Sequence, residues 1–556
     1  MMHPMATLQN RWPMATMKGY VDDLLLQVQG PAHIITETAG DMVEDCLSLL
    51  RDNQLEVSRG TWEEPGGESG VLISHRALEP VVKARFRKLG IALVDSLAYL
   101  GVDTGRRRAG RKKLKERCHK WAKRTGKLKG LLKATKGIRG GVKKVLKNGL
   151  WPSITYGARC LGLPANRIKT CRSSMARLLP GGHGSTTLKL ALHGLEPMAD
   201  FSGYPVTQWA RKAWEGKHTE LQARAWRKQA QWRLKPSSAD VKGPAGAVAM
   251  AIREAGWSWP APNTFLTKEN LLIDAEVTCP EDVRAMYSRD IAKQQWLRWT
   301  SDPRYSSLAP APLIRPIQNW LRKRGTTKMD QGVARALVTR GAVTQSVLHE
   351  WGWAASPICQ ECRTEDGTPQ HRYHSCEAGR TTRWGSEHRT WQHQADDDCK
   401  KGENILLWTR GLTKDPSSEW AFKPPPAETC CKVVKAADFE WDGTISGDIY
   451  PDGSKLGHTD WAQCSWAWVT LSGGKLRVGQ YGALPISLPV QRRIKRAELW
   501  AFHQALCCVL PPAVIHTDHL GIVQGLTTGK HWCTDGRRTH ADIWRMVWWQ
   551  LEDQGY

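Results

Sequence analysis

Three acidic residues near the end of the chain each lie in a local pattern that predicts the secondary structure around them. Asp452 follows the apolar start of IYPDGSK, so we expect it at the end of a strand. Glu498 lies in KRAELWAFHQAL, which has the spacing of a helix, and Asp518 ends the strand predicted in AVIHTDHLGIV. The predicted order is strand, strand, strand, helix, strand, which is typical of an α/β domain. Its members are a strand ending near Asp452, strands over 464–471 and 475–481, a helix over 496–510 and a strand over 514–517.

Carboxylates on a strand end, a helix and a second strand end can converge on one place. Hard divalent cations such as Mg²⁺ prefer oxygen ligands. Two such ions about 3.5 to 4 Å apart can activate water and stabilise the leaving oxygen in phosphodiester hydrolysis. The other interpretation is structural, because Asp-Gly is a common turn dipeptide and a Glu on an amphipathic helix often faces solvent.

The order DGS, RAEL, HTD resembles the type 1 ribonuclease H domain at the end of non-LTR retrotransposon polyproteins. Members of that family use two Mg²⁺ ions to cut the RNA strand of an RNA-DNA hybrid, leaving a 3'-hydroxyl and a 5'-phosphate. The resemblance implies that Asp452, Glu498 and Asp518 are the metal ligands and the catalytic residues. Ser454 follows the first of them, as it does in the family.

Two features depart from the family. Pro451 precedes the first Asp, where Thr is more frequent, but proline is tolerated at a strand end because only one amide donor is lost. The chain ends at Tyr556 after a helix predicted over 541–551, so the family's last strand, its mobile His and its fourth metal-binding Asp are absent. The resemblance thus implies an incomplete site. Two alternatives stay open: a catalytically dead remnant that binds nucleic acid, and a fragment that supplies ribonuclease H surface to an intact partner.

The start of the chain contains a second pair of acids. Residues 18–29 read KGYVDDLLLQVQ, which predicts two strands with Asp22 and Asp23 at the turn between them. This segment resembles the YxDD element of a reverse transcriptase palm, where paired carboxylates serve metal-dependent nucleotidyl transfer. Only nineteen residues precede Tyr20, so RNA-directed DNA polymerase activity is not expected from this chain. The alternative is an ordinary acidic hairpin.

Positive charge is concentrated in one segment of the chain. The net charge is +26, and residues 106–148 contain nineteen Lys and Arg against one acid, Glu116. A nucleic-acid backbone would neutralise such a run, so RNA, DNA or an RNA-DNA hybrid is the expected partner. In the family this position corresponds to the thumb; a membrane-surface helix and a nuclear localisation signal are the alternatives. The candidate binding residues are Arg106, Arg107, Arg108, Arg111, Lys112, Lys113 and Lys115.

A cluster of soft ligands lies in the middle of the chain. Its spacing is Cys359-x2-Cys362-x8-His371-x4-Cys376, with His374 as an alternative to His371. Thiolates with imidazole favour Zn²⁺, and four protein ligands indicate a structural ion. The segment resembles the zinc-binding region between polymerase and ribonuclease H in the same retrotransposon family. The alternative is a chance cluster in a loop that contains cysteines.

The remaining sequence favours a soluble, reduced protein. The other twelve cysteines follow no regular spacing, which favours a reducing, intracellular compartment and does not separate nucleus from cytoplasm. The N-terminus lacks a secretory signal, and the most apolar stretch, 89–102, is too short to span a bilayer. The loop GGHGSTT over 181–187 predicts a helix capped by Ser185 or Thr186. Nothing in the sequence indicates an oligomeric state.

These patterns predict a multidomain chain of α/β and α+β class with a ribonuclease H-like mixed sheet at its C-terminal end. The predicted parts are a reverse transcriptase palm remnant over 1–104, a basic helical thumb-like region over 105–233, a helical region over 263–345, a zinc knuckle over 346–380, a linker over 381–445 and a truncated ribonuclease H-like domain over 446–556.

Overall fold

The described residues of this computed structural model divide into two compact units. The first comprises Met1–Lys127, Lys147–Leu161 and Lys235–Ala247, and the second Leu128–Leu146, Gly162–Leu234 and Val248–Tyr556. Helices are mixed with sheets of two to five strands, in agreement with the predicted multidomain class. The structure describes residues 2–20, 23–61, 63–64, 69–73, 75–94, 96–99, 102–105, 112–134, 139–179, 185–217, 219–230, 243–339, 344–379, 389–457 and 462–555.

The first unit contains the hairpin expected near the N-terminus. β1 (Ala15–Tyr20) pairs antiparallel with β2 (Asp23–Val28), with Tyr20 opposite Asp23. Asp23 opens β2, whereas Asp22 lies outside the described residues. Helices α1 (Met2–Arg11), α2 (Ala32–Asp52) and α3 (Glu79–Lys88) accompany the short pairs β3 (Gly70–Val71) with β4 (Ala92–Leu93) and β5 (Ser96–Tyr99) with β6 (Val102–Gly105).

The described part of the basic segment begins with a long helix, α4 (Lys112–Ala134), and also contains the short helix α5 (Arg139–Lys144). Trp121 and Thr125, one turn apart, are buried on one face, and the Thr125 hydroxyl donates to the Trp121 carbonyl oxygen at 3.0 Å. Lys112 and Lys113 open the helix, while Arg106, Arg107, Arg108 and Arg111 lie outside the described residues. The exposed basic side chains of α4 are Lys115, Lys120, Lys123, Arg124, Lys127 and Lys129.

Two long helices organise the middle of the second unit. α10 (Pro197–Glu215) lies against α13 (Pro280–Thr300), and Gly203 allows the close approach because a Cβ there would lie 2.8 Å from Tyr287 Cδ1. Ser185 caps α9 (Thr186–His193) as predicted, since its hydroxyl accepts from the Leu188 amide. The neighbouring elements are α8 (Ala165–Leu178), α11 (Thr219–Ala230), α12 (Pro244–Ala255) and the sheet β7 (Ser258–Ala261), β8 (Thr264–Leu266), β9 (Leu272–Asp274).

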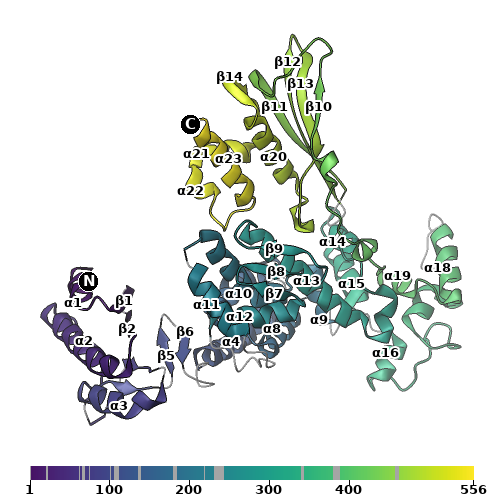
Figure 1. Cartoon of the computed structure of the whole chain (residues 1–556). Helices are drawn as coiled ribbons and strands as arrows, with labels where there is room; N and C mark the ends of the chain where they lie inside the picture. Colours follow the sequence, from purple (N-terminus) through teal and green to yellow (C-terminus); the bar gives the residue numbers. More distant parts are fainter. Residues whose placement is uncertain are drawn as a thin grey trace. The chain divides into compact units, whose positions relative to one another are not determined.

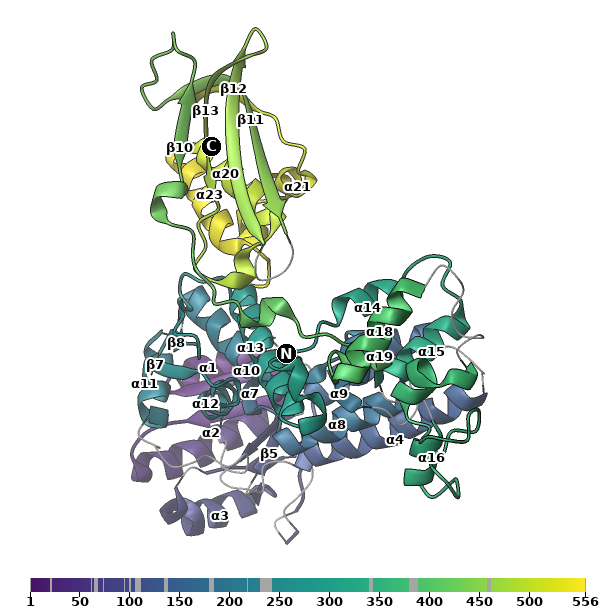
Figure 2. The same ribbon diagram turned by 90° about the vertical axis from the view of Figure 1, so that its right-hand side faces the viewer.

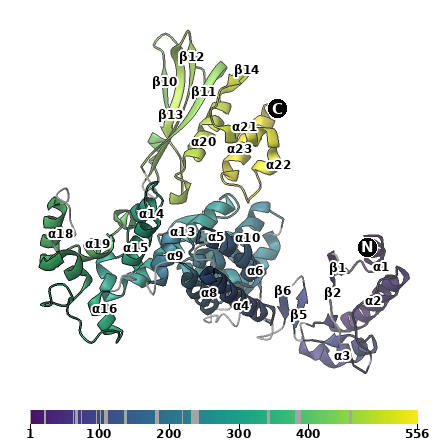
Figure 3. The ribbon, with the colours of Figure 1, turned by 180° about the vertical axis from the view of Figure 1, so that it is seen from behind.

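The linker predicted over 381–445 instead contains regular structure. α18 (Arg389–Lys401) and α19 (Ile405–Arg410) pack against each other, and β10 (Lys432–Lys435) joins the C-terminal sheet (Figure 3). Asp398 links the two helices because it accepts from Gln394, Asn404 and Trp408. α14 (Arg315–Trp320), α15 (Lys328–Thr339) and α16 (Gln345–Glu350) precede this region.

The C-terminal sheet has five strands in the order β10-β13-β12-β11-β14. β11 (Ile445–Leu456), β12 (Gln463–Ser472) and β13 (Lys475–Ala483) form an antiparallel meander, and β14 (Val509–Ile515) runs parallel to β11. Helices α20 (Ile494–Leu506) and α23 (Ala541–Asp553) lie on one side of the sheet, as Figures 1 and 2 show. The predicted order of strand, strand, strand, helix, strand is present.

The core of this sheet explains why α20 lies flat against it. Trp466 and Trp468 on β12 are buried beneath Ala501 and Ala505 of α20, whose small side chains allow close packing. α20 ends at Leu506 rather than at residue 510, because β14 starts at Val509. Pro511 and Pro512 are tolerated in β14 because it is an edge strand.

No helix within the described ranges is both long enough and apolar enough to cross a bilayer.

Candidate functional site

Helix α20 brings Glu498 against the strand that carries Asp452. The Gly453 amide donates a hydrogen bond to Glu498 Oε2 at 2.9 Å. A Cβ at Gly453 would lie 2.4 Å from the backbone nitrogen of Glu498, so only glycine fits between β11 and α20 here. The strand and helix backbones therefore fix the Glu498 carboxylate beside the residue that follows Asp452.

The register of the parallel strands accounts for the third carboxylate. Ile449 on β11 pairs with Ile515 on β14. Asp452 and Asp518 each lie three residues beyond that pair, which puts them at the same level of the sheet. β14 ends at Ile515 but β11 continues to Leu456, so Asp452 lies within β11 and not at a strand end as the sequence predicted. His519 then caps α21 (Leu520–Thr528), with its ring nitrogen accepting from the Gly521 amide at 2.9 Å. The turn after β14 thus has a defined course past Asp518.

The three carboxylates interact electrostatically. Burial, together with the charges of Asp452 and Asp518, raises the pKa of Glu498 to about 7, and the hydrogen bond from Gly453 opposes the rise. Both aspartates are exposed to solvent. Their oxygens are hard ligands of the kind that Mg²⁺ prefers, and their exposure leaves room for the water molecules that this ion usually retains.

The three carboxylates of Asp452, Glu498 and Asp518 are less tightly clustered than the predicted zinc ligands. In the described part of the chain, only Cys359, Cys362, His371 and Cys376 form a set whose ligand atoms all lie within 4.8 Å of one another. The three carboxylates do not gather this tightly.

Replacing Gly453 by Ala is expected to lower the free energy of unfolding by about 1 to 3 kcal/mol, because the new Cβ overpacks the contact between β11 and α20. Urea denaturation followed by tryptophan fluorescence measures the change. Gly332→Ala in α15 is the matched control, since no atom lies within 4 Å of a Cβ there. Equal stability of the two variants would contradict this account of Gly453.

The predicted zinc ligands converge. Cys359 Sγ lies 3.9 Å from Cys376 Sγ, and Cys362 Sγ lies 3.2 Å from His371 Nε2. Tetrahedral zinc with Zn-S bonds of about 2.3 Å separates two sulfur ligands by about 3.8 Å, so the cluster has the size that Zn²⁺ requires. Hydrogen bonds from Thr364 lower the pKa of Cys362 to about 6, which favours the thiolate form that binds metal.

The structure separates the two candidate histidines. His371 belongs to the cluster, whereas His374 Nε2 is 2.8 Å from the Trp408 carbonyl oxygen on α19. His374 therefore connects the zinc-ligand segment, residues 359–376, to α19. Glu365, which sequence reasoning missed, lies with Oε2 2.9 Å from His371 Nδ1. A carboxylate at the second ring nitrogen fixes the tautomer and orientation of a metal-binding histidine.

The variant Glu365→Gln is expected to weaken zinc binding by roughly 10- to 100-fold, because the carboxylate that orients His371 is lost. Competition with a coloured zinc chelator gives the affinity. Glu361→Gln makes the same charge change on an exposed neighbour and should bind zinc as the unaltered chain does. If both variants released zinc equally, Glu365 would have no orienting role.

Comparison of the chain with models of protein families, with curated proteins and with solved structures gives no match.

Proposed function

We propose that the chain is a fragment of a non-LTR retrotransposon polyprotein whose C-terminal domain hydrolyses the RNA strand of an RNA-DNA hybrid. The observation that carries this proposal is the position of Glu498, which is bound to the Gly453 amide and acted on by the charges of Asp452 and Asp518. The expected order of strands and helix surrounds this site. Type 1 ribonuclease H is the activity that these motifs resemble.

Each carboxylate has a distinct part in the proposed site. Asp452 on β11 and Asp518 after β14 are exposed at the level where β14 has ended, and a phosphodiester can approach them there. Glu498 is held by the Gly453 amide and so has the most restricted position. Two bound Mg²⁺ ions would activate the attacking water and stabilise the leaving oxygen. The three side chains would hold those ions, and the ions would orient the phosphodiester backbone of the substrate.

Positive charge supports a nucleic-acid substrate. The chain has a net charge of +26, and α4 exposes basic side chains on the faces away from Trp121. When a nucleic acid binds such a surface, the basic side chains displace the counterions of its phosphate groups. Binding therefore depends on the salt concentration. Zn²⁺ in the Cys3His cluster has a structural part only, because its four protein ligands leave no open position.

The substrate class is tested with a set of end-labelled duplexes of one sequence. We expect the purified chain to cut the RNA strand of an RNA-DNA hybrid in Mg²⁺. EDTA should abolish this cleavage. Double-stranded RNA and double-stranded DNA of the same sequence should stay intact. Cleavage of all three duplexes at equal rates, or cleavage that persists in EDTA, would contradict the proposed activity.

Binding without cleavage is the second candidate function. It is favoured by α4, whose exposed lysines do not depend on the carboxylate site. In that case the hybrid would be bound and would stay intact in Mg²⁺. The affinity would fall steeply between about 50 and 200 mM salt, because phosphate contacts release counterions.

A further inference from the structure

The C-terminal sheet domain is packed onto α10 and α13 of the same unit. Trp214 at the end of α10 donates from Nε1 to the Thr534 carbonyl oxygen at 3.0 Å. Cys279, which precedes α13, donates from Sγ to the Arg538 carbonyl oxygen at 3.1 Å. A Cβ at Gly536 would lie 3.0 Å from both Pro280 and Trp214, so the loop before α23 fits closely against both helices.

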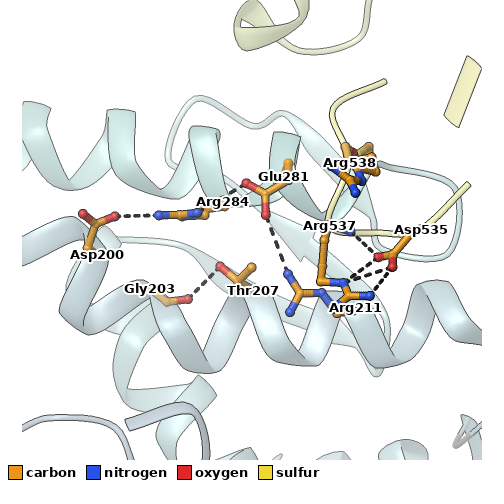
Figure 4. A network of polar contacts seen from close by, with 10 residues as sticks. Asp200, Gly203, Thr207, Arg211, Glu281, Arg284, Asp535, Arg537 and Arg538 are labelled. Atoms are coloured by element: carbon orange, nitrogen blue, oxygen red, sulfur yellow. Dashed lines mark hydrogen bonds and ion pairs between the residues drawn. The ribbon is translucent and has the colours of Figure 1, made fainter. Parts of the chain in front are cut away.

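Charged groups surround this contact. The Arg545 guanidinium of α23 lies 3.2 Å from the Trp214 ring centroid, and its Nη2 donates to the Trp214 carbonyl oxygen at 2.7 Å. Figure 4 shows the outer side of the same contact, where Glu281 lies between Arg284 and Arg211, and Asp535 pairs with Arg537. The loop before α23 is therefore held against α10 and α13 by packing and by hydrogen bonds to its backbone, and α23 itself by Arg545.

A buried ionic cluster lies at the inner side, at the start of α20. Asp282 on α13 is fully buried, with Oδ1 3.5 Å from Arg493 Nη2 and Oδ2 3.8 Å from Arg496 Nη1. Arg496 also donates two hydrogen bonds to Asp542 of α23. Asp282, Arg493, Arg496 and Asp542 are called the clamp below. The clamp joins α13, α20 and α23 one half-turn before Glu498.

Burial disfavours the charged form of the Asp282 carboxylate, and two arginines favour it. Desolvation raises its pKa to about 6, although Arg496 and Arg493 favour the charged form. Among the described residues, no donor makes a hydrogen bond to its Oδ1. A buried ion pair of this kind is a weak source of stability. A role in holding α20 in place accounts for the charge better than stability does.

We propose that Asp282 is a positioning residue of the nuclease site, which sets the first turn of α20 and thereby the place of Glu498 beside Gly453. The inference rests on the proposed function. It gives a part in that function to Asp282, which lies 216 positions before Glu498 in the sequence. The helices α10 and α13 are then a scaffold for the metal-binding carboxylates.

The variant Asp282→Asn tests the inference without leaving a buried cation unpaired. Arg496 keeps Asp542 as its partner, and Arg493 is about one-third exposed. The matched control is Glu281→Gln on the same helix, which makes the same chemical change one residue earlier. Glu281 instead pairs with Arg211 of α10 and with Arg284 of its own helix (Figure 4).

For Asp282→Asn in the full chain we expect about a tenfold rise in the Mg²⁺ concentration for half-maximal cleavage, by analogy with groups that orient metal ligands. The KM for the hybrid and the urea midpoint should stay unchanged, or the midpoint should rise. Glu281→Gln should behave as the unaltered chain. An unchanged Mg²⁺ requirement in Asp282→Asn, or a loss of activity that parallels a loss of stability, would overturn the positioning role.

Hydrogen exchange separates failure of this inference from failure of the proposed function. If the unaltered chain does not cut the hybrid, the exchange rates of the α20 amides and of the Gly453 amide still report on the clamp. Faster exchange in Asp282→Asn than in Glu281→Gln supports the positioning role of Asp282. Equal exchange in the two variants overturns it.

Discussion

Asp452→Asn is expected to lower the rate of hybrid cleavage about a thousandfold, which corresponds to about 4 kcal/mol of transition-state stabilisation. The amide keeps the shape of the side chain but removes the negative charge that attracts Mg²⁺. Because Asp452 is exposed, the fold should be unaffected. Single-turnover cleavage of a labelled hybrid in Mg²⁺ measures the loss.

Asp448→Asn is the matched control for Asp452. Asp448 is also exposed and lies on β11 four residues earlier, where it pairs with His516 at 2.8 Å. It should cut at the normal rate. Binding of the hybrid by Asp452→Asn should be unchanged in the absence of Mg²⁺, since phosphate contacts do not require this carboxylate. Equal cleavage by the two variants would place the chemistry elsewhere.

The double variant Cys359→Ser, Cys376→Ser is expected to lose zinc and the fold of the knuckle. Structural zinc contributes about 10 to 16 kcal/mol in small zinc-binding domains, which is more than the few contacts of this segment can replace. The contact of His374 with the Trp408 carbonyl oxygen should be lost as well. Metal analysis of the purified protein and hydrogen exchange over residues 357–376 measure both effects.

Cys399→Ser is the control for the zinc variant. Cys399 is buried on α18 beside the knuckle, but Gln370 contacts its backbone carbonyl oxygen and its thiol is not in the cluster. This variant should retain one zinc ion per chain. The zinc assignment would be wrong if the unaltered chain held no zinc, or if the double variant held as much as Cys399→Ser.

Local patterns predicted the kind and order of the elements that carry the carboxylates, but not their bounds. Asp452 lies inside β11 instead of at a strand end, and the strand predicted over 514–517 spans Val509–Ile515. The strands and helix around Asp452, Glu498 and Asp518 have clear apolar periodicity, and the CxxC spacing identified the knuckle. β10 was missed because all four residues of KVVK are exposed on an edge strand, so no alternation marks it. α18 was likewise hidden in a polar stretch, whereas α19 is apolar (ILLWTR) but too short to show a helical period.

Contacts between distant segments could not be predicted from local patterns. Arg496 and Asp282 are 214 positions apart, and nothing near either residue indicates its partner. The choice between His371 and His374 depended on Trp408, which comes after a further helix. The close approach at Gly453 follows from the packing of α20 on β11, which the DG dipeptide alone does not indicate.

Cleavage of an end-labelled RNA-DNA hybrid in Mg²⁺ by the full chain, beside Asp518→Asn, tests the central claim most directly. Asp518 lies at the same level of the sheet as Asp452, and its charge raises the pKa of Glu498. We predict that the unaltered chain cuts the RNA strand and that Asp518→Asn leaves it intact while still binding the hybrid. An intact hybrid in both reactions, or equal cutting in both, would contradict a nuclease site built from these three carboxylates.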